Sequence, residues 1–167
     1  MAGTSETVLN NWSAAAVETA LNTARNTQSQ VALAAWQNDL SHLPEDPEDF
    51  AAWVHLAPKP FGLVLLDEET MERPLGAKRY ERDLTVYVCV GFASTTAFAR
   101  QTEQAKTEDS TVEGIEDGLN SSYFTGAYPR AAYQGCRYIP LGLLGMQEVG
   151  MVVTRWTVQV TRTQGAA

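Results

Sequence analysis

The strongest pattern in the chain is an alternation of hydrophobic and polar positions from Arg82 to Phe92. One face of this segment carries Leu84, Val86, Val88, Val90 and Phe92, and the other carries Thr85, Tyr87, Cys89 and Gly91. A period of two residues is typical of a β-strand. Because both faces can be covered by other elements, we expect this strand to lie at the centre of a sheet.

Further strands are predicted at Phe61–Leu66, Cys136–Leu144 and Val149–Thr161. The second of these is interrupted by Pro140 and Gly142, which favours a bulged or edge strand. The segment Val31–Trp36 also alternates and favours a strand, although its alanine content also allows a helix.

Three helices are predicted from apolar positions that recur every three or four residues. The first runs from Leu9 to Ala24. The second helix begins at Pro47, a residue type suited to the first helical position, with Asp46 as its N-cap. It ends before Pro58. The third is Ser110–Asn120, where Ser110 and Glu113 have capping-box spacing. The polar segment 94–107 gives no clear pattern.

These elements form the order helix, strand, helix, strand, strand, helix, strand, strand across residues 1–167. The order predicts one α+β domain of two layers, in which helices cover one face of a mostly antiparallel sheet. Residues 1–7 are small and polar and are expected to be a loose N-terminus. The charged segment 67–79 is expected to be a protruding loop or arm.

The net charge of −8, from 20 acidic and 12 basic residues, argues against a broad electrostatic grip on nucleic acid. Two cysteines, Cys89 and Cys136, are too few for a disulfide framework, and we expect both to be small buried side chains. No apolar run has the length of a membrane span, and no secretory signal segment is recognised.

No catalytic, cofactor-binding or metal-binding residue is predicted. Phosphate-binding loops, nucleophile elbows and dinucleotide fingerprints are absent from the sequence. The two histidines, His42 and His55, have no further ligand at metal-binding spacing. The acids at 45, 46, 48 and 49 suit the start of a helix. Those at 67–72 lie in the polar arm, without a nearby apolar pocket to shift their pKa.

Two segments are predicted to contact other protein subunits. The arm carries mixed charges that suit complementary contacts, and its candidates are Asp67, Glu68, Glu69, Glu72, Arg73, Lys78 and Arg79. A second stretch is rich in Tyr and Arg, the types enriched at interface hot spots, and its candidates are Tyr123, Tyr128, Arg130, Tyr133 and Arg137. Aromatic and basic residues together can also stack on single-stranded nucleic acid, but the acidic total weighs against that function.

Three stretches resemble the Mu-like gp37 family of phage tail proteins, which are identified as tail terminators. They are APKPFGLVLL at 57–66, ERDLTVYVCV at 81–90 and VTRWTVQV at 153–160, with the predicted short helix Val112–Leu119 between the last two. The resemblance implies a virion protein, assembled in the host cytoplasm, that forms a homo-oligomeric ring, expected to be a hexamer.

Such a ring caps the head-proximal end of the tail tube and joins it to the neck. Its implied partners are the tail tube protein and possible sheath and neck proteins, and DNA passes its lumen without specific binding; no membrane is involved. Three alternatives remain open: another phage neck, minor tail or baseplate subunit, an isolated partner-binding domain unrelated to phage, or a small ligand-binding module or enzyme. The last needs a concave site with convergent polar groups, and the sequence nominates none.

Overall fold

The computed structural model describes residues 15–37, 47–119 and 131–163. In chain order the elements are helix α2 (Ala15–Thr27), strand β1 (Ala35–Gln37), helix α3 (Pro47–Leu56), strands β2 (Phe61–Gly76) and β3 (Arg79–Ser94), helix α4 (Ala97–Glu113), π-helix η2 (Gly114–Leu119), and strands β4 (Ala131–Leu144) and β5 (Gln147–Thr163). The predicted N-terminal segment 1–7, the start of the first helix and the cap at Asp46 lie outside the described residues.

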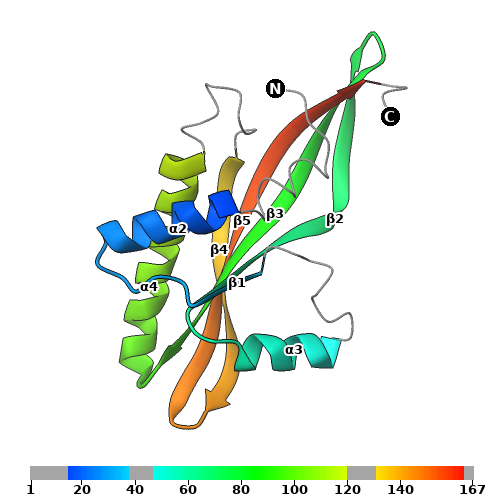
Figure 1. Cartoon of the computed structure of the whole chain (residues 1–167). Helices are drawn as coiled ribbons and strands as arrows, with labels where there is room; N and C mark the ends of the chain where they lie inside the picture. The colour runs from blue at the N-terminus through cyan, green and yellow to red at the C-terminus, as the bar shows by residue number, and fades with distance from the viewer. Residues whose placement is uncertain (1–14, 38–46, 120–130, 164–167) are drawn as a thin grey trace.

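The described strands form one five-stranded sheet in the order β1-β2-β3-β5-β4. Strand β1 runs parallel to β2, and the other neighbours are antiparallel. The predicted α+β fold with a mostly antiparallel sheet is confirmed, as is the central place of β3 (Figure 1). Strand β4 lies at an edge, with register shifts between Tyr133 and Gly135 and between Pro140 and Gly142, as the interrupted pattern predicted.

The helices cover both faces of the sheet, which corrects the prediction that they share one face. Helices α2 and η2 supply Val17, Leu21 and Ile115 to a cluster with the even-numbered side chains of β3. Helix α3 supplies Val54 to a second cluster on the opposite face, with Cys89. The reason is that β3 and its neighbours are apolar on both faces, so a single layer of helices would leave one face exposed to water.

Segment 67–79 is not a loop but the far half of the β2–β3 hairpin, which we call the arm. The two strands pair from Phe61 opposite Gly91 to Gly76 opposite Arg79, with a register shift between Leu66 and Thr70. Strand β5 accompanies β3 along its whole length, since Thr163 lies opposite Arg79. The hairpin extends well past the helices in Figure 1, so the predicted protrusion is present and built of strand.

Helix α4 begins earlier than the pattern indicated. Thr96 is its N-cap, and the Thr96 hydroxyl oxygen accepts a hydrogen bond from the backbone N–H of Ala99 at 3.0 Å. Ser110, predicted to cap the third helix, lies inside α4 and is buried, where its hydroxyl donates to Gln30 at 3.0 Å. After Ala97, Phe98 and Ala99 the segment from Arg100 to Asp109 is polar apart from Ala105, so no hydrophobic period marked this part of the helix.

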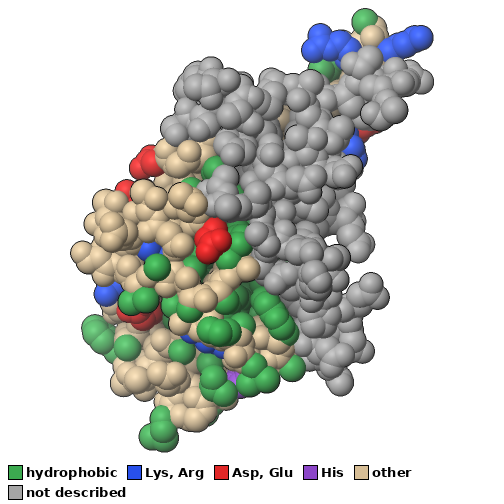
Figure 2. Space-filling model, in the orientation of Figure 1, with side chains coloured by type: hydrophobic (Ala, Val, Ile, Leu, Met, Phe, Trp, Pro, Cys, Tyr) green, Lys and Arg blue, Asp and Glu red, His purple; other side chains and the backbone are tan. Residues whose placement is uncertain are grey.

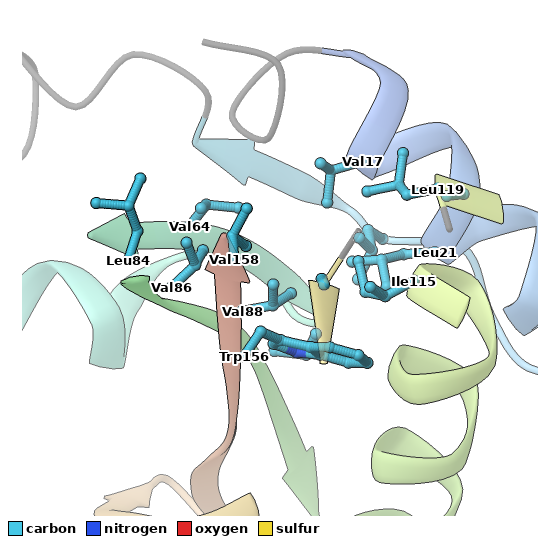
Figure 3. Close-up of a cluster of buried hydrophobic side chains, with 14 residues drawn as sticks. Val17, Leu21, Val64, Leu84, Val86, Val88, Ile115, Leu119, Trp156 and Val158 are labelled. Atoms are coloured by element: carbon cyan, nitrogen blue, oxygen red, sulfur yellow. The ribbon is translucent and has the colours of Figure 1, made fainter. Parts of the chain in front are cut away.

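Trp156 of β5 is the largest fully buried side chain in the core that faces α2 and α4 (Figure 3). Its indole N–H donates to the hydroxyl of Thr154 at 2.8 Å, and that hydroxyl donates to the backbone oxygen of Val88 at 2.9 Å. All three residues are buried. This relay gives the indole N–H a partner inside an apolar core, where an unpaired donor is costly.

A close contact joins α2 to η2 at two glycines spaced four residues apart. A Cβ atom on Gly118 would lie 2.7 Å from the Cβ atom of Ala20, and one on Gly114 would lie 2.9 Å from the Ala20 backbone oxygen. Both distances are too short for real contacts. The two helices therefore approach each other at a distance that only glycine permits on the η2 side.

We predict that Thr154→Val destabilises the protein by about 1–3 kcal/mol, because the indole N–H loses its acceptor inside the core. Denaturant unfolding followed by Trp fluorescence and circular dichroism measures the change. In a Trp156→Phe background, Thr154→Val should lower the free energy of unfolding by a smaller amount. The difference between the two backgrounds, which is the coupling energy, should be at least about 0.5 kcal/mol. Equal costs in the two backgrounds would show that the relay contributes nothing.

We predict that Gly118→Ala destabilises the protein by about 1–3 kcal/mol through overpacking against Ala20. Adding Ala20→Gly removes the Cβ atom that the new Cβ at position 118 would meet. The double variant should therefore recover part of the lost stability, even though glycine within a helix itself costs about 1 kcal/mol. Gly114→Ala meets backbone instead, and Ala20→Gly should not rescue it. Thermal unfolding of the four variants tests this, and equal rescue of both glycine variants would contradict the contact.

Candidate functional site

The arm holds many of its charged side chains in ion pairs between neighbouring strands. Arg73 on β2 pairs with Asp83 on β3 at 2.7 Å (Nη1 to Oδ2) and also with Glu81. Arg82 pairs with Glu72 at 3.3 Å (Nε to Oε2). The hydrogen bond from Arg73 lowers the pKa of Asp83, and the two carboxylates raise the pKa of Arg73. These pairs link the two strands, and the Arg73 side chain remains 50% exposed to solvent.

Two cations remain at the tip of the arm. Lys78 lies in the two-residue turn with Ala77, and both have positive φ, as hairpin turns of this length require. Lys78 and Arg79 are exposed, and no ion pair is found for either within the described part of the chain. Figure 2 shows Lys and Arg side chains at the far end of the hairpin. Asp67, Glu68 and Glu69 lie on β2, but their side chains are outside the described set.

The predicted Tyr/Arg stretch is divided between the two faces of the sheet. Tyr123, Tyr128 and Arg130 lie outside the described residues. Tyr133 packs on Trp156 with ring centroids 5.1 Å apart, and its hydroxyl donates to Glu108 of α4 at 2.9 Å. Arg137 is exposed, and it lies opposite Val153, a residue of the α3 face.

Tyr133 therefore joins the sheet to α4 and is committed to the fold. Burial and the bond to Glu108 raise the pKa of Tyr133, so its hydroxyl remains a donor at neutral pH. Among the described residues of this stretch, Arg137 is the one whose charge faces outward. Its role in a subunit contact stays a prediction.

Beside α3, the sheet carries an open apolar groove of about 630 Å³. Leu65, Tyr87, Ile139 and Val153 are among the side chains that line it, and Arg137 and Arg155 border it. Its one buried thiol, Cys89, is desolvated, which raises its pKa to about 12. A thiol with that pKa is protonated at neutral pH, so Cys89 is a packing residue and a poor nucleophile.

An exposed apolar end lies opposite the arm, where the β4–β5 turn meets α3 and α4. Met146 is 92% exposed, Phe98 80% and Leu143 70%, and Leu56 at the end of α3 is exposed as well. A ring nitrogen of His55 lies 3.0 Å from the Leu143 backbone oxygen, which brings α3 beside the turn. Hydrophobic side chains gather over this part of the molecule in Figure 2. We call these residues the apolar end.

In residues 15–37, 47–119 and 131–163, no group of three or more His, Cys, Asp or Glu side chains lies close enough together to bind a metal ion. Within the same ranges, no helix has both the length and the apolar character needed to cross a bilayer. His55 contacts a backbone oxygen, and His42 lies outside the described residues.

The sequence analysis missed a second charged site, a cleft lined by Arg25, Lys59 and Lys106. These residues come from three separate segments, so no local motif joins them. One signal was available: Arg25 follows Leu21 by four residues and so continues the buried stripe of the first helix. A cation at such a position needs a buried partner or a ligand.

Comparison with the models of known protein families finds no match to this chain, and a search of curated proteins finds no similar sequence. Function therefore has to be inferred from the surfaces that the fold itself presents. The most distinctive of these are the charged arm and the apolar end, which lie at opposite ends of the same sheet (Figure 1).

Proposed function

We propose that this protein is a structural subunit of a phage virion, a tail terminator that forms a ring at the head-proximal end of the tail tube and joins it to the neck. The observation that carries the proposal is the charged arm, which projects past the helices at one end of the sheet. A ring of identical subunits requires two different patches that meet, one from each neighbour. The arm tip can supply one of these patches, and a different surface of the neighbouring subunit has to receive it.

The three stretches that resemble the tail-terminator family support the proposal by their positions. They fall in β2, β3 and β5, and these strands are immediate neighbours in the sheet. The resemblance thus concerns one continuous piece of structure, the central ribbon and the root of the arm, rather than scattered segments.

Charge complementarity offers a place for the arm in a neighbouring subunit. Lys78 and Arg79 are exposed at the arm tip, and exposed carboxylates stand on α4 and η2 at Asp109, Glu116 and Asp117. Opposite charges on two patches of one chain orient head-to-tail contacts and discourage other arrangements. The net charge of −8 suits a lumen that DNA passes without binding.

The test is the mass of the purified protein by native mass spectrometry, together with negative-stain images of assembled tails. We expect a ring of about six 18.3 kDa chains, located where the tail meets the head. A strict monomer at high concentration together with tails that lack the protein at that end would overturn the proposal. Location at the baseplate would instead favour the alternative structural role.

A pair of variants tests the arm. Lys78→Gln combined with Arg79→Gln removes two positive charges from the tip, and we expect ring formation to need about tenfold more protein, a change of about 1.4 kcal/mol. Thr95→Glu combined with Gln101→Glu changes the net charge by the same amount near the start of α4, away from the arm and from Asp117, and serves as the control. If both variants weaken the ring equally, general repulsion rather than the arm is responsible.

A further inference from the structure

A cleft of about 390 Å³ lies where the segment after α2 passes the end of β3 and helix α4. Arg25, Lys59 and Lys106 all contribute to its lining, and Glu103 is the one carboxylate among the described residues that line it. Three cations against one acid is a local excess of positive charge in a chain whose net charge is −8. Such a reversal of sign in a concave site concentrates anions.

Arg25 forms the buried part of this cleft. The residue is only 5% exposed, and its Nε donates to the backbone oxygen of Val31 at 2.6 Å. Its Nη1 is buried and has no hydrogen-bond partner among the described residues. Burial lowers the pKa of Arg25 and nearby Glu103 raises it, and a guanidinium keeps its charge in proteins. The guanidinium group of a residue that lines the cleft therefore carries a buried donor without an acceptor.

Lys59 and Lys106 add charge around it. The Lys59 ammonium donates to the backbone oxygen of Ala57 at 2.7 Å and to that of His55, both at the end of α3. An ammonium has three donors, so one is left after these two bonds. Lys106 stands at the exposed rim, with its Nζ 3.8 Å from a Glu103 carboxylate oxygen.

From this arrangement we propose that the cleft binds an oxyanion, a carboxylate or phosphate group, with Arg25 as its buried anchor. The guanidinium offers parallel N–H donors that match the two oxygens of such a group. Lys59 and Lys106 neutralise the remaining charge, and Glu103 opposes binding and sets a modest affinity. The anion belongs either to a free small molecule or to an acidic side chain of a second copy of this chain.

The first test titrates citrate and inorganic phosphate into the protein at constant ionic strength, by calorimetry and by thermal unfolding, with sodium chloride as the reference. We expect binding that raises the melting temperature. Lys106→Gln should weaken the affinity several-fold, and Glu103→Gln should strengthen it several-fold. Arg155→Gln, which removes one exposed charge beside the apolar groove on another part of the sheet, should leave the affinity unchanged.

The decisive result is that Lys106→Gln and Glu103→Gln change the anion affinity in opposite directions. Neither residue is buried, so both variants should fold. No binding of either anion, or binding that Lys106→Gln and Glu103→Gln leave unchanged, would overturn the proposal. Arg25→Gln should abolish binding where the variant folds, as judged by its circular dichroism spectrum.

A second experiment identifies the source of the anion, and its outcome does not depend on ring formation. If the group comes from a second copy, saturating citrate should reduce the oligomer mass in light scattering, and Lys106→Gln should reduce it without citrate. If the ligand is a free small anion, citrate should bind and leave the mass unchanged. Both results place an oxyanion in the cleft. Failure of ring formation with intact citrate binding would count against the proposed function alone.

Discussion

Strand β3 has apolar residues on both faces, and the need to cover both determines the arrangement of the other elements. Leu84, Val86, Val88 and Val90 are buried in the cluster that α2 and η2 complete, and Cys89 on the opposite face is buried in the cluster that α3 completes. At roughly 25 cal/mol per Å² of apolar surface, leaving either face in water would cost several kcal/mol. The helices therefore lie on both sides of the sheet. The hydrogen bonds through Thr154 allow the indole N–H of Trp156 to be buried in this apolar core with a partner.

Much of this fold could be predicted from periodicity. The alternation in β3, the proline-marked start of α3 and the interrupted pattern of β4 all gave elements that the structure contains. The side of the sheet on which α3 lies could not be predicted, because periodicity within an element does not say which face of another element it will cover. Helix α4 was missed at its start because the segment after Ala97, Phe98 and Ala99 is polar from Arg100 to Asp109 apart from Ala105, and tertiary contacts further along hold it in place.

The candidate surfaces were predictable only in part, for a related physical reason. A charged segment can be recognised from the sequence, but whether its charges face outward depends on the register between strands. Arg73 pairs with Glu81 and Asp83 on the neighbouring strand, and Tyr133 contacts Trp156 and Glu108. The role of either residue in a subunit contact stays a prediction. The cleft at Arg25 depends on segments far apart in the chain, and no spacing in the sequence could have revealed it.

The arm also has a mechanical consequence. Strands β2, β3 and β5 run side by side toward its tip, and β3 and β5 stay paired along their whole lengths, roughly 50 Å at the usual rise per residue. A pull along this ribbon loads many backbone hydrogen bonds at once, in shear, instead of opening them one after another. The three strands thus act as a stiff lever. A small rotation of the helices and core would move the tip through a much larger distance, and a load at the tip would reach the core undiminished.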